Sequence, residues 1–194
     1  MDQRNVQTID LLARIEKGEG SAMNQLIQLW ETRVYNMAYK MLRDHDKAMD
    51  IMQKTFIKMY RSLNQLKDAT KFKSWLYTIV VNYCKSDLRT MSRVEPLNHD
   101  LNQRKDLAQN PGQKFEQMEL KEIILTALQQ IPNEQKAIII LKEYEGFKFH
   151  EIADTLDISI NTAKSRMYYG LKSMRKVLMN NPKSKEIYYE LYNH

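Results

Sequence analysis

The sequence is poor in cysteine, glycine and proline. It has one cysteine, five glycines and four prolines among 194 residues. A single cysteine, Cys84, excludes an internal disulfide and a thiolate metal cluster, which fits a reducing compartment, and its place in an apolar helical pattern indicates a packing role. Because glycine and proline interrupt helices, the absence of both from positions 21 to 95 favours long helices there. Gly170 lies within a helical pattern, where it indicates close approach to a neighbouring element.

Long hydrophobic runs are also missing. The first twenty residues, MDQRNVQTIDLLARIEKGEG, are polar and contain no apolar stretch long enough for a signal peptide or a membrane span. We therefore expect a soluble, cytoplasmic protein with no membrane insertion.

The residue patterns of common enzymes and metal sites are absent as well. The four histidines stand without metal-ligand spacing: His45, His99, His150 and His194. There is no glycine-rich phosphate loop, and no Ser, His and Asp constellation is discernible. We expect a protein without catalytic activity, cofactor or bound metal.

What the sequence does contain is a moderate basic excess and helical periodicity. Thirty Lys and Arg residues stand against 24 Asp and Glu, for a net charge of +6 and a pI of about 9.2. This balance suits nucleic acid or an anionic surface without requiring either. Apolar residues recur at helical spacing and no strand pattern is visible, so we expect an all-α fold.

The helical periodicity divides the chain into two parts. Residues 1–92 are predicted to form one helical domain, and residues 114–194 a second domain with a carboxy-terminal tail. Between them, residues 93–113 lose the periodicity and gain Pro96, Pro111 and Gly112. We expect this stretch to be a flexible linker, since loops within compact domains are usually shorter.

One predicted helix, over residues 72–89, combines an apolar face with a cationic one. Its apolar residues follow three- and four-residue spacing: Trp75, Leu76, Ile79, Val80 and Tyr83. Around the rest of this segment lie polar and cationic side chains: Lys71, Lys73, Asn82, Lys85 and Arg89. Such a helix can pack on a core and bind a polyanion, although a core helix with a solvated lysine face has the same pattern. The spacing of Trp75 favours a core anchor over direct DNA contact.

The carboxy-terminal part has the pattern of a helix-turn-helix. A short apolar helix over 149–156 is followed by a tight turn over 157–159 and a longer final helix. Seven cationic residues and no acidic residue lie between Ile158 and Lys185. In this motif, the first turns of the second helix enter the major groove, and here they carry polar side chains: Asn161, Thr162, Lys164, Ser165 and Tyr168. The alternative is a helical hairpin that packs on another protein with its charge solvated.

Two long segments resemble the extracytoplasmic function (ECF) class of the bacterial sigma-70 superfamily. The first domain contains RVYNMAYKMLRDHDKAMDIMQKTFIKMYRSL followed by FKSWLYTIVVNYCKSDLR, and the second contains LQQIPNEQKAIIILKEYEGFKFHEIADTLDISINTAKSRMYYGLKSMRKVL. The resemblance runs from about Met23 to Leu178 with a gap at the linker. It implies two helical domains that bind core RNA polymerase and promoter DNA.

The resemblance assigns DNA contacts to both domains. It implies that two consecutive segments bind the unpaired strand of the minus-ten element, whose exposed bases are available for contact. These segments are the loop from Leu66 to Lys71 and the stretch that follows it through Arg89, including Lys73, Asn82 and Lys85. It implies that duplex at the minus-thirty-five element is read by Lys164, Ser165 and Tyr168, with support from Lys142 and Arg166. Tyr169 stands where the family commonly has arginine and His150 where an acid is usual, so the preferred bases can differ.

The resemblance also assigns a polymerase-docking surface to the predicted helix DHDKAMDIMQKTFIKMYRSL, residues 44–63. Asp46, Asp50 and Gln53 are expected to face the partner, because carboxylates suit an arginine-rich docking surface. Met49 and Lys54 stand where the family commonly has acids, and less negative charge should weaken the dock. The alternative is that these acids cap helices or remain solvated.

Together, these features imply a non-catalytic initiation factor that carries core polymerase to promoters and assists strand opening. An anti-sigma factor as a further partner is left open. One alternative is a stand-alone helix-turn-helix regulator whose first domain senses or dimerises. Another is an interaction protein that occupies a sigma-binding partner without contacting DNA.

Overall fold

The computed structural model describes residues 3–93 and 113–185 of the chain, and this part contains helices and no strand. It therefore confirms the all-α prediction. No described helix is long and apolar enough to span a membrane. The elements follow in the order α1 (Gln3–Glu16), α2 (Gly20–Leu42), α3 (His45–Ser62), the 3-10 turns η1 (Leu63–Gln65) and η2 (Ala69–Lys71), α4 (Phe72–Arg93), α5 (Gln113–Gln129), α6 (Asn133–Ile139), the π-helical turn η3 (Ile140–Tyr144), α7 (Phe149–Leu156) and α8 (Ile160–Asn180).

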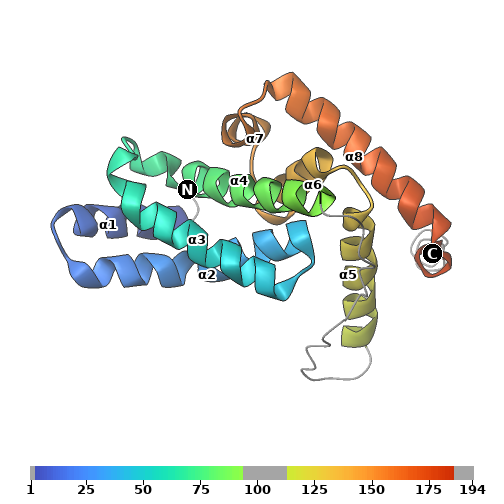
Figure 1. Ribbon diagram of the computed structural model, residues 1–194, viewed down its shortest axis with the longest axis horizontal. Coiled ribbons are helices and arrows are strands. Elements are labelled where there is room, and N and C mark those ends of the chain that lie inside the picture. The colour runs from blue at the N-terminus through green and yellow to red at the C-terminus, as the bar shows by residue number, and fades with distance from the viewer. Residues whose placement is uncertain (1–2, 94–112, 186–194) are drawn as a thin grey trace.

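Helices α1 to α4 form the amino-terminal half of the structure (Figure 1). The buried Trp30 belongs to its core. Trp30 is 1% exposed and lies in α2. Its indole Nε1 donates a hydrogen bond of 3.0 Å to Thr8 Oγ1 in α1, and its ring lies 5.6 Å from that of Phe72 in α4. A buried indole needs a partner for its N–H, so Thr8 allows this side chain to fill the core without leaving a donor unpaired.

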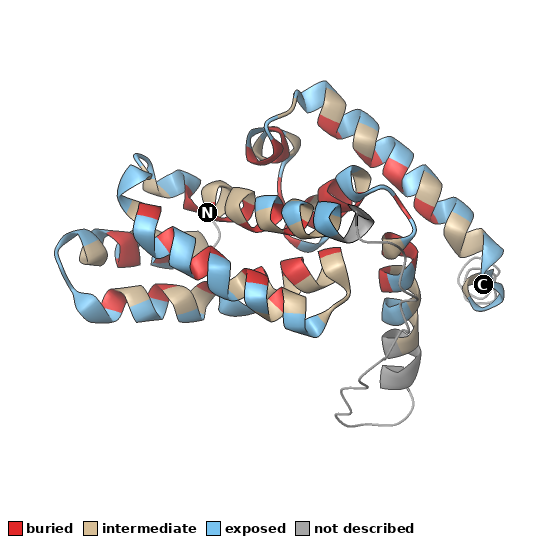
Figure 2. Cartoon of the chain, viewed as in Figure 1, coloured by how far each residue is buried: buried red, intermediate tan, exposed pale blue. Residues whose placement is uncertain are grey.

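Helices α5 to α8 form the carboxy-terminal half, in which α7 and α8 make the predicted helix-turn-helix. The turn begins at Asp157, whose φ of 53° ends α7 in the left-handed conformation that terminates many helices. Ser159 caps α8, because its Oγ accepts a hydrogen bond of 3.0 Å from Thr162 N. Figure 2 shows buried residues along the inner side of α8 and exposed residues along the outer side.

The two halves contact each other directly, which the sequence did not predict. Helix α7 packs on α4 (Figure 1). The rings of Tyr77 and Phe147 meet edge to face at 5.1 Å. Burial of α4 accordingly extends beyond the predicted apolar stripe to Tyr77, Val81 and Cys84. Trp75 is half-buried and packs on Phe72 at 5.9 Å, as its spacing predicted. Most of the predicted linker lies outside the described residues, and the domain boundaries stay a prediction.

Gly170 allows α8 to approach α6 closely, which confirms the prediction of a tight contact. A Cβ atom at Gly170 would lie 2.9 Å from Ile139 Cδ1 and 3.2 Å from Gln135 Cβ. Both distances are shorter than ordinary van der Waals contact. The packing of the helix-turn-helix on α6 therefore depends on the missing side chain.

We expect the substitution Gly170→Val to destabilise the protein by about 1–3 kcal/mol, the usual cost of forcing extra methyl groups into a packed interface. The free energy of unfolding, measured with urea, tests this. Gly20→Val is the matched control, because a Cβ at Gly20 meets nothing within 4 Å. An equal loss in both variants would show that the contact with α6 does not set the effect.

Candidate functional site

The acidic residues predicted to face a partner lie together on α3. Asp46, Asp50 and Gln53 are all exposed, and their spacing places them on one side of the helix. Asp44, just before them, plays a different part, because its side chain accepts a hydrogen bond of 3.0 Å from Lys47 N and caps α3. The capping role accounts for Asp44, whereas Asp46 and Asp50 remain available to contact a partner. We call the surface formed by Asp46, Asp50 and Gln53 the α3 face.

Lys54 partly neutralises the α3 face. Its Nζ lies 2.5 Å from Asp50 Oδ2, an exposed pair at i,i+4 spacing. This pairing raises the pKa of Lys54, first through the hydrogen bond to Asp50. A cation that binds Asp50 competes with an arginine from a partner for the same carboxylate.

Two apolar side chains extend the α3 face, and the sequence patterns above did not identify them. Ile57 is 52% exposed and Tyr60 is 68% exposed, and both follow Gln53 at helical spacing. The signal was present in the sequence, since positions 53, 57 and 60 continue the line begun by Asp46 and Asp50. Exposed apolar residues next to polar ones are typical of interaction surfaces.

The loop before α4 is held in shape by its own side chains. Asp68 Oδ1 accepts hydrogen bonds from Thr70 Oγ1 at 2.6 Å and from Thr70 N at 2.9 Å, and these bonds lower the pKa of Asp68. Leu66 is half-buried against the core, while Lys71 at the end of η2 is exposed. The loop therefore offers a fixed backbone with one cationic side chain at its end.

The polar face of α4 remains open at its carboxyl-terminal half. Asn82 and Arg89 are exposed, and Lys85 is half-buried. Lys73, at the other end of the helix, is different. Its Nζ donates a hydrogen bond of 2.7 Å to the main-chain carbonyl of Glu145 and lies 4.2 Å from the centre of the Phe147 ring. The structure thus separates Lys73, which contacts the carboxy-terminal half, from the other predicted minus-ten residues.

The start of α8 presents four of the predicted minus-thirty-five residues on one exposed face. Asn161, Lys164, Ser165 and Tyr168 are exposed and follow i, i+3, i+4 and i+7 spacing. We name this group the α8 face. It combines an amide, an ammonium and two hydroxyl groups, which can pair with base edges and phosphates.

The other predicted minus-thirty-five residues serve contacts within the carboxy-terminal half. Arg166 Nη2 pairs with Glu134 Oε2 of α6 at 2.7 Å, and the backbone of Thr162 is bound by the cap residue Ser159. The Nζ atom of Lys142 lies 5.3 Å from the centre of the Phe149 ring. These side chains brace the helix-turn-helix, and their DNA-binding role stays a prediction.

A buried carboxylate marks the contact between the halves. The Glu145 side chain is 3% exposed and follows η3. Its Oε2 accepts a hydrogen bond from the Tyr77 hydroxyl and lies 3.1 Å from Arg33 Nη1, so both of these partners come from the amino-terminal half. Burial and the neighbouring Glu145 charge raise the pKa of Tyr77, which keeps its hydroxyl protonated as a donor.

The carboxyl end of α2 is capped by side chains from the carboxy-terminal half. The last carbonyls of a helix lack partners within the helix. Here Lys136 Nζ donates to Met41 O at 3.2 Å and to Gln129 Oε1 at 2.8 Å, while Gln129 Nε2 donates to Lys40 O at 2.9 Å. Lys136 is 2% exposed, and burial lowers its pKa from 10.5 to about 8.

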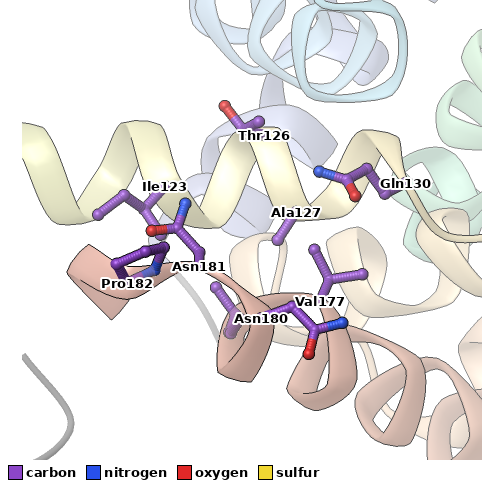
Figure 3. Close-up of a pocket in the computed structure, with 9 residues that line it drawn as sticks. Ile123, Thr126, Ala127, Gln130, Val177, Asn180, Asn181 and Pro182 are labelled. Carbon is purple, nitrogen blue, oxygen red and sulfur yellow. The ribbon is translucent and has the colours of Figure 1, made fainter. Parts of the chain in front are cut away.

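A shallow pocket of about 290 Å³ lies between α5 and the end of α8 (Figure 3). Ile123, Ala127 and Val177 form part of its wall, and Gln130 and Asn180 supply amide groups. No acidic or basic side chain lines this pocket, so it offers no group for proton transfer. Among the described residues, no cluster of three or more His, Cys, Asp or Glu side chains could hold a metal ion.

Cys84 is fully buried in α4, as its apolar surroundings predicted. Burial raises the pKa of its thiol to about 12. Because the thiolate is the reactive form, this side chain serves packing and is chemically inert at neutral pH.

Two family profiles match this chain, one in each half. The profile of Sigma-70 region 2 matches residues 26–94, and that of Sigma-70 region 4 matches residues 121–174. An ECF RNA polymerase sigma-E factor of Haemophilus influenzae is 28% identical over 81% of this chain and 88% of its own length. An RNA polymerase sigma-H factor of Pseudomonas aeruginosa is 25% identical over 89% of this chain and 94% of its own.

Solved structures show the same likeness. The sigma factor RpoE from Bartonella quintana, in complex with the anti-sigma factor NepR, has a TM-score of 0.64 and 26% identity over 80% of this chain and 96% of its own. CnrH, in complex with the cytosolic domain of CnrY, has a TM-score of 0.68 over 90% of this chain and 99% of its own, and at 18% identity it shows a shared fold.

Lys136 gives the stability of the protein a pH dependence. Below about pH 8 the amine is protonated in both the folded and the unfolded chain. Between about 8 and 10.5, the unfolded chain keeps the proton that the folded chain has lost, so stability should rise with pH relative to a variant without the amine. We expect the difference in unfolding free energy between the natural protein and Lys136→Met to grow by up to about 1.4 kcal/mol per pH unit in this window.

Urea unfolding at pH 7.0, 8.5 and 9.5 tests this expectation. Lys142→Met is the control, because it makes the same substitution at a half-buried lysine of the carboxy-terminal half. A difference between the natural protein and Lys136→Met that stays constant across this range would contradict the account of the buried amine.

Proposed function

The chain belongs to the extracytoplasmic function class of the sigma-70 family, and from this we propose how its surfaces divide the work of starting transcription. It is an RNA polymerase sigma factor, which binds core RNA polymerase and recognises promoter DNA. In our proposal, the α8 face reads duplex at the minus-thirty-five element. The loop before α4 and the polar face of α4 hold the unpaired strand of the minus-ten element. The chain contributes binding in the cytoplasm, and catalysis belongs to the polymerase.

The observation that carries this proposal is the α8 face itself. Four side chains that pair with bases or phosphates stand exposed at the amino end of the second helix of a helix-turn-helix. This is the part of the motif that enters the major groove. Downstream on the same helix, Lys172, Arg175 and Lys176 are also exposed and add positive charge for the phosphate backbone.

The α3 face is our candidate for the core-polymerase dock. Its acids suit an arginine-rich partner, and Ile57 and Tyr60 add apolar area beside them. Two similar proteins are solved in complex with a partner protein: the sigma factor RpoE with the anti-sigma factor NepR, and CnrH with the cytosolic domain of CnrY. We propose that an anti-sigma factor can regulate this chain as well.

Tethering through the polymerase should make two modest DNA contacts act as one strong contact. We therefore expect the free factor to bind promoter DNA weakly and the factor with core polymerase to bind it tightly. A gel-shift titration with and without core polymerase measures this. Equal, tight binding by the factor alone would contradict the dependence and favour a stand-alone regulator.

Replacing Lys164 and Ser165 by alanine should weaken binding of the polymerase complex to promoter DNA. A lost base contact costs about 1–3 kcal/mol, so the double variant should lose roughly ten- to a hundredfold or more in affinity. Lys17→Ala is the control, since Lys17 is an exposed lysine between α1 and α2. Normal core binding with reduced DNA binding is the expected result, and unchanged DNA binding would remove the α8 face from the proposal.

The pairing of Lys54 with Asp50 makes a separate prediction for the α3 face. Lys54→Glu releases Asp50 and adds an acid, so we expect core polymerase to bind more tightly by up to about fivefold, from the roughly 0.2–1 kcal/mol typical of exposed charges. The affinity for core polymerase is measured by fluorescence titration, and the gain should shrink at high salt. Lys17→Glu makes the same charge change away from α3. Equal gains in both variants would assign the effect to net charge alone.

A further inference from the structure

The loop before α4 carries an acid among its lysines, which attraction to phosphate alone does not require. Asp68 is exposed, and so are Lys67 and Lys71 on either side of it. A carboxylate repels the phosphate backbone, so this acid opposes non-specific binding of DNA. We infer that Asp68 determines base specificity: one oxygen of its carboxylate accepts a hydrogen bond from the amino group of an unpaired cytosine or adenine in the minus-ten element. The inference rests on the proposed function, because it names the base chemistry that this loop recognises.

The two oxygens of the Asp68 carboxylate have different surroundings. Oδ1 accepts from Thr70 Oγ1 at 2.6 Å and from Thr70 N at 2.9 Å. Within residues 3–93 and 113–185, no hydrogen bond to Oδ2 is formed. One oxygen therefore fixes the orientation of the side chain, and the other is left as an acceptor for a ligand.

The backbone that carries this carboxylate is anchored on both sides. Ala69 packs against the core, and Lys71 N donates a hydrogen bond of 3.0 Å to Asp68 O. Phe72, directly after the loop, is 1% exposed, and its ring lies 5.6 Å from that of Trp30. A group held in place before binding loses little conformational freedom when its ligand arrives. The loop thus presents the acceptor in a fixed position.

The protonation state of Asp68 makes it an acceptor only. The hydrogen bonds from Thr70 and the charge of Lys71 lower the pKa of its carboxyl group, so it is ionised at neutral pH. Cytosine and adenine carry an amino group at the position where thymine and guanine carry a carbonyl oxygen. An ionised carboxylate attracts the amino group and repels the carbonyl. It can therefore distinguish these bases once the strand is unpaired and the amino group is free.

Guanine is disfavoured by the bonds that Asp68 already makes. A carboxylate pairs with the N1–H and N2–H groups of guanine through both of its oxygens. Here Oδ1 already accepts two hydrogen bonds from Thr70, which use its two lone pairs. A single available oxygen suits the single amino group of cytosine or adenine better.

Asparagine at position 68 separates base reading from a purely structural role. Asp68 caps η2, and asparagine is an equally good capping residue, because its Oδ1 can accept the same bonds from Thr70. At the other branch, however, an NH₂ donor replaces the acceptor Oδ2. A donor is complementary to a carbonyl oxygen. We therefore expect Asp68→Asn to keep the loop intact and to reverse its base preference.

Binding to an unpaired promoter strand tests this reversal. The probe is a promoter fragment that the polymerase complex transcribes, with mismatches that leave the minus-ten region unpaired. Each cytosine of the unpaired strand is replaced by uracil and each adenine by hypoxanthine, one at a time, which exchanges the amino group for a carbonyl. For the complex with the natural protein, we expect one replacement to weaken binding about tenfold, measured by fluorescence anisotropy. For Asp68→Asn, the same replacement should strengthen binding.

Two control variants accompany the test. Asp10→Asn removes the same charge at an exposed position of α1 and should keep the base preference of the natural protein. Asp68→Ala removes both the cap and the acceptor, so it should bind more weakly and lose the preference. An Asp68→Asn protein with the natural preference, or a natural protein that no replacement affects, overturns the inference.

Lys71→Ala keeps this inference distinct from the proposed function of the loop. If Lys71→Ala and Asp68→Ala both bind the unpaired fragment as the natural protein does, the loop does not hold the minus-ten strand, and base reading fails with it. If Lys71→Ala binds more weakly but Asp68→Asn keeps the natural preference, the loop retains its proposed function and only base reading by Asp68 is disproved.

Discussion

The fold depends on where one buried charge can find partners. Glu145 sits at the end of η3, between helices, and a carboxylate in such a place is tolerated only beside donors. Its donors, Tyr77 and Arg33, belong to α4 and α2. The position of the carboxy-terminal half on the amino-terminal half is therefore specified by a charge, while the area around it, including the Tyr77 and Phe147 rings, supplies the apolar burial.

A second polar contact, at the end of α2, also specifies how the carboxy-terminal half is positioned on the amino-terminal half. Lys136 and Gln129 supply hydrogen-bond donors to carbonyls that α2 cannot satisfy by itself. The amino-terminal half thus supplies the carbonyl acceptors at the end of α2, and the carboxy-terminal half supplies the buried amine of Lys136 that donates to them. A seam built from such pairs is selective about its geometry, because any shift leaves a buried polar group without a partner.

Much of this architecture follows from local sequence patterns. Helical spacing predicted the long helices, the helix-turn-helix and the packing roles of Trp75 and Cys84, and an isolated helical glycine predicted the close approach at Gly170. The seam did not follow, because its signals are single polar residues whose partners lie far away in the chain. Nothing near Glu145 in the sequence points to Arg33, 112 positions earlier. Likewise, the partners of Lys73 and Arg166 depend on how helices pack, which periodicity alone does not determine.

The burial of Cys84 limits how redox signals in the cell could regulate this protein. The only thiol of the chain lies sealed in α4 with a pKa near 12, so peroxides and disulfides meet neither an accessible sulfur nor an appreciable thiolate. Oxidative stress therefore has no direct chemical entry into this molecule through cysteine. Any thiol-based redox information that alters the genes it controls has to be sensed by another molecule and delivered through binding.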